Sequence, residues 1–215
     1  MKKGKKLHGN KETVVKVCNW LSLPLQALGC CILYLVIEAF SRHSLASAWS
    51  YMVESPWVFL YNAFLIFTTF MVVYLFRRRV LVRLIMSCFW LLLGIINGVI
   101  LANRVTPFTG PDLRNLSDGA KVVTKYLSKG TMILVAAALV ALLAFFVWVW
   151  IKGPKFQGKI RWYLNVPLIA LVIVLFTGAT NLALAKRVLS SYFVNIAFAY
   201  QDYGYPYCLA VTLFD

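Results

Sequence analysis

Apolar residues gather in five long stretches along the chain, and shorter polar segments separate them. Each stretch holds roughly 20 residues, which is the length that an α-helix needs to cross a hydrocarbon core of about 30 Å. The pattern therefore predicts an all-α, polytopic membrane protein with five transmembrane helices. We expect these spans at residues 17–40, 57–76, 84–102, 131–151 and 162–185.

The composition agrees with this class, because 61% of the 215 residues are hydrophobic and only 13% are charged. A typical soluble domain has about 45–50% apolar and about 25% charged residues. Cysteine adds little, since Cys18, Cys30, Cys31 and Cys88 lie in or beside the spans, where packing is their expected role. Cys208 lies in a segment that we expect to be exposed, where lipidation or redox chemistry is the alternative to packing.

The formal net charge of +15 is divided unevenly between the two sides of the predicted bundle. Residues 1–16 and the two tight loops after the second and fourth spans carry 14 of the 22 Lys and Arg residues. Because cytoplasmic loops are rich in Lys and Arg, this bias predicts a cytoplasmic N-terminus and an extracellular C-terminus. Residues 1–16 then form a basic cytoplasmic head. The charge follows the topology and attracts anionic lipids, so we expect no nucleic-acid partner.

Two segments on the predicted outer side each carry one apolar helical face. In residues 111–130 the apolar positions are spaced by three and four, with Pro111 and Asp112 at the start and lysines at the end. Residues 186–202 repeat the pattern through Leu189 and Ile196. Neither segment is apolar all round, so we expect two amphipathic helices that lie in the outer membrane interface. The alternative is an ordinary surface helix packed on the bundle.

Basic and hydroxyl side chains after the third span are candidates for binding lipid headgroups. Arg104 and Thr106 follow the span directly, and Lys121 and Lys125 lie on the first amphipathic segment. Arginine and lysine at headgroup level bind phosphate oxygens, so the expected partners are anionic phospholipids such as phosphatidylglycerol. The alternative for Arg104 is a side chain that snorkels to the interface and stabilises the turn.

Few polar side chains lie within the predicted spans. Glu38 is the only acid there, and we expect it to reach the outer interface or to pair with Arg42 one turn later. The others are expected to form hydrogen bonds between helices, and a hydrophilic pathway is the alternative. They are Asn62, Asn97, Asn165, Thr177, Thr180 and Asn181. The sequence offers no catalytic group and no His, Cys or carboxylate spacing typical of a metal site, so we expect no cofactor in this chain.

The last segment of the chain contains a turn followed by a short apolar run. Asp202, Tyr203, Gly204, Tyr205 and Pro206 form the predicted turn, because Gly204 permits unusual dihedral angles and Pro206 fixes its own φ. We expect this turn to be a hinge at the outer interface. Residues 186–215 are then an extracellular interfacial helix followed by the start of a connector.

Two motifs resemble a known family. NRVTPFTGPDL with KYLS after the third span, and AYQDYGYPYCLAVTLFD after the fifth, are similar to the membrane part of the lipoteichoic acid synthase family, the sulfatase-type phosphoglycerol transferases. The resemblance covers essentially the whole chain. Its most distinctive part is the DYGYPYC turn, whereas the spans are generic.

The resemblance implies a bacterial cell-envelope transferase in which five membrane helices precede an extracellular, alkaline-phosphatase-like domain. In that family the outer domain uses a threonine nucleophile and a divalent metal, usually manganese, to move glycerol phosphate from phosphatidylglycerol onto a polymer. None of those catalytic residues matches a position of this sequence, so we expect the chain alone to be inactive. Its expected role is to anchor the missing catalytic domain in the bacterial cell membrane and to position its lipid substrate.

Two other classes of function remain open from the sequence. A small transporter or flippase requires Asn62, Asn97, Asn165 and Asn181 to surround a hydrated cavity. A scaffold protein would instead bind a second copy of the chain, or partners in envelope synthesis, through its outer helices.

Overall fold

The computed structural model describes residues 22–115, 129–153, 156 and 162–214, and every regular element in these residues is helical. This confirms the all-α fold class. Four helical spans are long and apolar enough to cross a membrane, judged by length and composition. They are α2 (Ser22–Ser41), α4 (Pro56–Phe70) with its 3₁₀ continuation η1 (Met71–Leu75), α5 (Arg79–Leu101) and α9 (Trp162–Ala185). The basic head lies outside the described residues.

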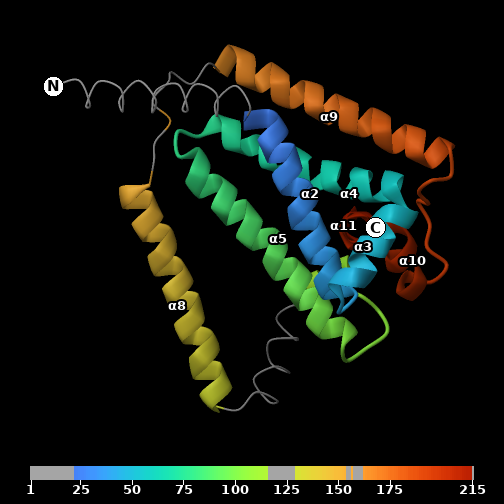
Figure 1. Cartoon of the computed structure of the whole chain (residues 1–215), viewed down its shortest axis with the longest axis horizontal. Coiled ribbons are helices and arrows are strands. Elements are labelled where there is room, and N and C mark those ends of the chain that lie inside the picture. The colour runs from blue at the N-terminus through green and yellow to red at the C-terminus, as the bar shows by residue number, and fades with distance from the viewer. Residues whose placement is uncertain (1–21, 116–128, 154–155, 157–161, 215) are drawn as a thin grey trace.

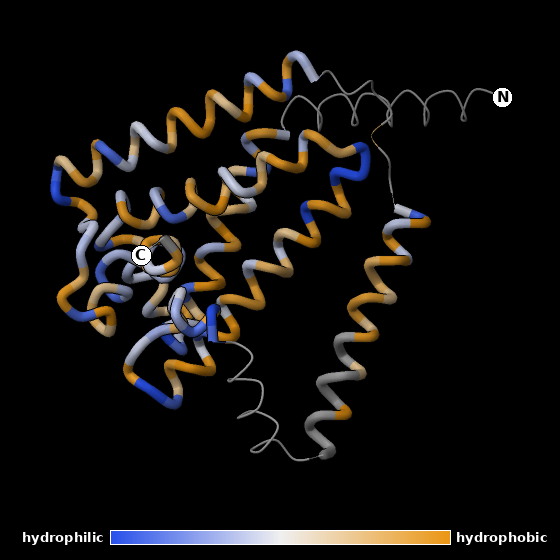
Figure 2. The backbone as a smooth tube through the Cα atoms, turned by 180° about the vertical axis from the view of Figure 1, so that it is seen from behind, coloured by the Kyte–Doolittle hydropathy of each residue, from blue (hydrophilic) through white to orange (hydrophobic). Residues whose placement is uncertain are grey.

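The remaining apolar stretch of the sequence forms α8 (Lys129–Lys152), which stands apart from the other long helices in both views (Figures 1 and 2). It meets α5 at one end, where the Arg78 guanidinium lies 5.0 Å from the centroid of the Trp150 ring. The apolar part with described side chains is Val140–Lys152. That α8 is a fifth span remains a prediction.

Helices α2, α4 and α5 form the packed centre of the bundle. Gly98 of α5 lies so close to α2 that a Cβ atom added there would be 2.7 Å from the Phe40 carbonyl oxygen. One turn earlier, Gly94 lies against Ile37. Small residues four apart allow two membrane helices to approach closely, which explains how α2 and α5 pack along this stretch.

Helix α9 lies along the outside of α4 (Figure 1). The hydroxyl groups of Tyr61 and Thr180 are 2.9 Å apart, and the Tyr61 ring stacks on Phe176 with 5.4 Å between centroids. Toward the other end of α9, the Asn165 side chain donates a 2.8 Å hydrogen bond to the carbonyl of Tyr74. The Phe64 ring also meets the Phe176 ring edge-on, with 5.5 Å between centroids. Two polar and two aromatic contacts therefore connect α9 with α4 and η1.

Short helices gather at one end of the bundle, which we call the cap end. They are α3 (Leu45–Glu54), α6 (Gly110–Arg114), α10 (Ile196–Tyr203) and α11 (Tyr205–Phe214). We call residues 196–214 the cap. The opposite end, the arginine end, carries residues 77–83, the last residues of α8 and the first residues of α9 (Figure 1). In Figure 2 the long helices between the two ends are predominantly hydrophobic.

The cap end shows two differences from the expected elements. Residues 41–55, which lie between the first two expected spans, contain α3, because the Ser44 side chain accepts a hydrogen bond from the backbone N–H of Ser47 and caps the helix. The amphipathic helix expected at residues 186–202 is too long. After α9 the chain turns at Arg187, which has a φ of 56°, and the next helix begins only at Ile196.

The third span also begins earlier than expected, at Arg79 rather than at residue 84. The arginines there are accommodated in a helix because aromatic rings pack against their guanidinium groups: Arg79 lies 3.8 Å from the Phe156 ring centroid and Arg83 lies 5.9 Å from that of Tyr74. The other expected amphipathic helix starts as α6 at Gly110–Arg114, and its residues 116–128 lie outside the described part.

Candidate functional site

The first turn of α11 is buried against the bundle, and side chains from two other helices satisfy its backbone. The first N–H groups of any helix lack intrahelical acceptors. In α11, Tyr205 N–H donates to the Glu38 carboxylate at 3.1 Å and Tyr207 N–H donates to the Asn62 side-chain oxygen at 2.9 Å. Pro206, between them, has no N–H to satisfy. Glu38 of α2 and Asn62 of α4 therefore cap α11 completely over these three residues.

The end of α10 is held by the same group of side chains. Arg42 donates to the carbonyl oxygen of Gln201 at 2.7 Å, and Asn62 donates to that of Tyr203 at 2.8 Å. Arg42 also pairs with Glu38 at 3.0 Å. The acid thus lies at the positive end of α11 and the base at the negative end of α10, which is the favourable arrangement for both helix dipoles.

Gly204 connects the two cap helices through a backbone conformation that other residues rarely adopt. Its φ is 81° and its ψ is 151°. A Cβ atom at this position would lie 2.2 Å from the Tyr34 hydroxyl oxygen and 2.7 Å from the Asn62 side-chain nitrogen. Both the dihedral angles and the space therefore require glycine. This confirms the expected conformational role of Gly204.

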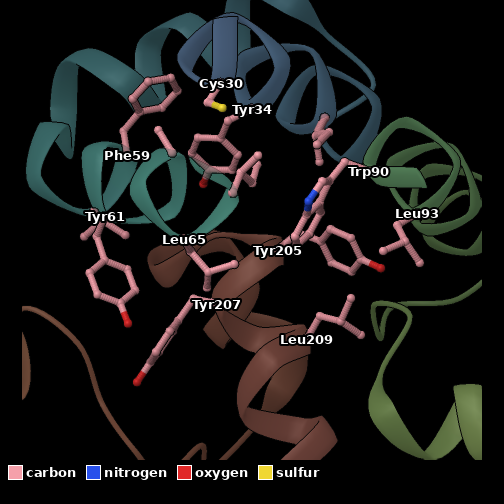
Figure 3. Close-up of a cluster of buried hydrophobic side chains, with 14 of the residues drawn as sticks. Cys30, Tyr34, Phe59, Tyr61, Leu65, Trp90, Leu93, Tyr205, Tyr207 and Leu209 are labelled. Atoms are coloured by element: carbon pink, nitrogen blue, oxygen red, sulfur yellow. The ribbon is translucent and has the colours of Figure 1, made fainter. Parts of the chain in front are cut away.

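Buried aromatic and apolar side chains of α2, α4, α5 and α11 pack together beside the docked cap (Figure 3). Tyr34, Tyr205 and Glu38 are fully buried, with 0% of their surfaces exposed. The Tyr34 ring lies 4.8 Å from that of Phe59, and Arg42 lies 4.0 Å from the centroid of the Tyr51 ring. We call Glu38, Arg42 and Asn62 the docking triad, because they join the cap to α2 and α4. Glu38 and Asn62 are fully buried, and the Arg42 side chain is 17% exposed.

A second buried amide holds the loop before α6. Asn97 of α5 donates to the Ser41 hydroxyl at 2.9 Å and accepts from the backbone N–H of Phe108 at 2.8 Å. The loop in turn contacts the cap, because Gly110 N–H donates to the Thr212 hydroxyl at 3.0 Å. Glu38, Asn62 and Asn97 therefore have one use in common, which is to bind backbone groups of segments at the cap end.

The expected headgroup residue Arg104 is engaged within its own loop. It forms a bidentate pair with Asp112 and donates to the carbonyl oxygens of Thr106 and Pro107 at 2.9 and 2.8 Å. This matches the alternative in which Arg104 stabilises the turn. Thr106 supplies only its carbonyl to these contacts. The other two candidates, Lys121 and Lys125, lie outside the described residues.

Asp112 makes the stability of this loop depend on pH. Burial opposes its ionisation, but hydrogen bonds from Arg104 and Thr109 outweigh burial and lower the pKa of Asp112 below its ordinary value. A carboxylate with a lowered pKa stabilises the fold above its unfolded pKa of about 3.9, and this contribution is lost as pH falls through the folded pKa.

We therefore expect Asp112→Asn to lower the free energy of unfolding by about 1 kcal/mol or less at pH 7, and by nothing once the pH is well below 4. The measurement is the unfolding midpoint of both proteins in detergent between pH 3 and pH 7. Asp202→Asn, at an exposed position of the cap, is the matched control and should leave the profile unchanged. A wild-type advantage over Asp112→Asn that is as large at pH 3 as at pH 7 would contradict this role.

The remaining polar residues of the spans do not meet in one place. Asn62 and Asn97 are fully buried at separate contacts, Asn165 binds Tyr74 near the arginine end, and Asn181 is exposed on α9. Thr177 donates to the Ile173 carbonyl within its own helix. The prediction of hydrogen bonds between helices is confirmed for Asn62, Asn97, Asn165 and Thr180.

Three sequence expectations about individual residues were wrong or incomplete. Glu38 does pair with Arg42, but it lies inside the bundle rather than at the interface, because the cap covers it. Cys208 is not exposed, since α11 buries it to 1%. Of the five expected hinge residues, Asp202 is exposed, Tyr203 is half-buried, and Gly204, Tyr205 and Pro206 are buried. The apolar run after them forms a helix packed against α4 and α6.

Two apolar grooves flank the contact between α4 and α9 near the cap. One, of about 700 Å³, opens between α4, α5, α9 and α11. The other, of about 750 Å³, lies between α4 and α9 and is lined by Trp57, Leu60, Phe64, Leu182 and, near its cap end, Lys186. Among its described lining residues, Lys186 is the only charged one. We call this second one the α4–α9 groove.

Within the described residues, no group of three or more His, Cys, Asp or Glu side chains could hold a metal ion. The docking triad has a carboxylate and a guanidinium, but both are already paired with each other and with backbone groups. The arrangement therefore binds a segment of the protein itself. It does not present a reactive group to a substrate.

Comparison of the chain with protein-family models, with curated proteins and with solved structures found no match. The described part of the chain defines the class directly: it is all-helical, with four spans long and apolar enough to cross a membrane and a helical cap docked by polar side chains from those spans and the residue after α2.

Proposed function

We propose that the chain is the membrane anchor and lipid-positioning module of a phosphoglycerol transferase similar to the lipoteichoic acid synthases. The observation that carries this proposal is the α4–α9 groove beside the docked cap. An apolar trough with a single cation at one end matches the acyl chain and the anionic headgroup of a phospholipid such as phosphatidylglycerol.

In this proposal the arginine end faces the cytoplasm, α8 is the fifth span, and the cap end faces outward in a bacterial cell membrane. The Lys and Arg bias of the whole sequence supports this orientation, with 14 on the expected inner side and 8 on the outer side. Basic residues with described side chains divide evenly between the two ends. Five lie at the arginine end (Arg77, Arg78, Arg79, Arg83 and Lys152) and five at the cap end (Arg42, Arg104, Arg114, Lys186 and Arg187), where the four described acids also lie. The grooves near the cap would then open to lipids of the outer leaflet.

The docking triad would keep the cap in a fixed position beside that lipid. Because the cap is held by charged and amide hydrogen bonds beside buried apolar side chains, it is suited to fixing the distance between the membrane and any group that the cap orients. Positioning of this kind is the main requirement for transfer of a phosphoglycerol group between two bound molecules. The transferase reaction and its manganese ion are inferred from the family resemblance alone.

In this proposal Lys186, rather than Arg104, binds the lipid headgroup. Arg104 is committed to Asp112 and two carbonyl oxygens, whereas Lys186 is exposed at the end of the groove. Lys121 and Lys125 stay candidates from the sequence. The transporter or flippase alternative is less well supported, because its four asparagines do not line a shared cavity.

A scaffold function remains the second candidate, and the position of α8 favours it. The described side chains of α8 include exposed Val147, Trp148 and Ile151, and the helix contacts the bundle at one end only. A second copy of the chain or a partner in envelope synthesis would bury this apolar surface more completely than the chain does alone.

Photo-crosslinking with phosphatidylglycerol tests the lipid-positioning role. The lipid carries a diazirine on one acyl chain, and the protein is reconstituted in nanodiscs of phosphatidylcholine. We expect labelled peptides from α4 and α9, and about fivefold less labelling in Lys186→Gln, since one surface cation contributes about 1 kcal/mol toward an anionic lipid.

Lys152→Gln is the matched control, because Lys152 is an exposed lysine at the opposite end of the bundle. It should leave labelling of α4 and α9 unchanged. A diazirine-phosphatidylcholine probe should label the same peptides without dependence on Lys186. Equal effects of Lys186→Gln on both probes, or no labelling of α4 and α9, would remove the basis of the proposal.

A further inference from the structure

A separate cavity of about 320 Å³ lies between α2 and α5 toward the arginine end, far from the docked cap. Its polar lining comes from Ser22 and Gln26 on α2 and from Arg83 and Ser87 on α5. The rest of its wall is apolar and includes Gly29, beside which an added Cβ atom would find no other atom within 4 Å. The cavity is therefore open space next to a small polar cluster.

Gln26 has an unmet hydrogen-bonding requirement in this cavity. Its side chain is 6% exposed, and its Oε1 accepts from the Arg83 Nε at 3.1 Å. This contact directs the amide so that Nε2 has no hydrogen-bond partner among the described residues. A buried donor without an acceptor destabilises the fold, and an acceptor from outside the protein chain would remove this cost.

The charge at this end of the bundle points to an anionic acceptor. Arg83 is the charged residue among the described lining of the cavity. Arg78 and Arg79, at the start of α5 and outside that lining, each have a buried guanidinium nitrogen without a partner in the described part of the chain. Both ion pairs found in that part lie at the cap end. Arginine and amide donors, with no carboxylate among the described lining residues, form a pattern that suits phosphate oxygens.

We propose that this cavity binds a phosphate group, with Arg83 and the Gln26 Nε2 as principal donors and the Ser22 and Ser87 hydroxyls beside them. The ligand is either the headgroup phosphate of an anionic phospholipid or free phosphate. The apolar part of the wall has room for the start of a lipid chain. This site lies toward the opposite end of the bundle from the α4–α9 groove, so the inference does not depend on the proposed function.

Native mass spectrometry of the full chain released from nanodiscs tests the site. One arm uses phosphatidylcholine discs containing phosphatidylglycerol, and the other uses phosphatidylcholine discs with inorganic phosphate in the buffer. Arg83→Gln is expected to weaken the adduct about tenfold. Gly29→Leu fills the cavity while leaving Arg83 and Gln26 in place, and it should abolish the adduct. Arg77→Gln, an exposed arginine at the same end, is the matched control and should retain it.

The expected pattern is an adduct that is retained in Arg77→Gln, weakened in Arg83→Gln and lost in Gly29→Leu. If phosphatidylglycerol shows this pattern, the cavity is a lipid headgroup site. If inorganic phosphate shows it, the cavity is a site for free phosphate. Gly29→Leu keeps Arg83, so its result does not depend on whether Arg83→Gln folds correctly. The unfolding midpoint of each variant is measured in the same samples. If neither ligand forms an adduct that is lost in Gly29→Leu, or if Arg77→Gln weakens it as much as Arg83→Gln does, the cavity is not a phosphate site.

Discussion

Replacing Glu38 with alanine is expected to release the cap from the membrane helices. The change leaves the buried Tyr205 N–H without its acceptor and removes the carboxylate partner of Arg42, which keeps only the Gln201 carbonyl. Breaking a buried ion pair by removing one partner costs about 3–5 kcal/mol, and we expect the lower end because the Arg42 side chain is 17% exposed. Since each 1.4 kcal/mol is a factor of ten, the population of undocked cap should rise at least about 100-fold. Glu38→Gln retains an acceptor for Tyr205 and should have a smaller effect.

Cys208 provides the measurement, because it is 1% exposed on α11 when the cap is docked. In a variant whose other cysteines are replaced by serine or alanine, a maleimide reagent should label Cys208 slowly. Labelling should accelerate in the order wild type, Glu38→Gln, Glu38→Ala. Glu54→Gln, at an exposed acid of α3, is the matched control. Labelling rates that are equal in Glu38→Ala and the control would contradict the role of Glu38.

The second large effect is expected from Gly204→Ala. The backbone there has a φ of 81° and a ψ of 151°, a conformation that costs a residue with a side chain about 1–3 kcal/mol. The added methyl group would also overlap the Tyr34 hydroxyl and the Asn62 amide, both of which are fixed in the interior. The free energy of unfolding should therefore fall by about 3 kcal/mol or more. The structural disruption should be centred on the junction of α10 with α11.

Gly178→Ala is the control for this prediction, because no atom outside its own helix lies within 4 Å of the added Cβ. Alanine is the better helix former there by about 0.5–1 kcal/mol, so this variant should be as stable as wild type or slightly more stable. The measurements are the unfolding midpoint in detergent and the labelling rate of Cys208. Similar midpoints for Gly204→Ala and Gly178→Ala would show that the turn is not held as described.

The long helices could be predicted from the sequence because their signal is local. A run of about 20 apolar residues has few other stable forms in a membrane, so the expected spans at 57–76 and 162–185 agree closely with α4–η1 and α9. The boundaries differed where side chains override the pattern. Arg79 and Arg83 are polar but lie on α5, because Phe156 and Tyr74 pack against their guanidinium groups.

The docking triad could not be predicted in the same way, because its contacts join residues far apart in the chain. Tyr205 is 167 positions from Glu38, and Tyr207 is 145 positions from Asn62. The sequence did contain a local hint, since a glycine followed after one residue by a proline marks the end of one helix and the first turn of the next. Read in that way, Gly204 and Pro206 predict two short helices where we expected a hinge and a connector.

Hydrogen exchange of two backbone amides tests most directly whether the membrane helices hold the cap. Tyr205 and Tyr207 lie in the first turn of α11, where amides have no intrahelical acceptor, so any protection must come from Glu38 and Asn62. Measured by NMR in lipid nanodiscs, both amides should exchange far more slowly than those of Leu45 and Ala46, which lie in the exposed first turn of α3. Glu38→Ala should remove the protection at Tyr205. Exchange at Tyr205 and Tyr207 as fast as at Leu45 and Ala46 would contradict a docked cap.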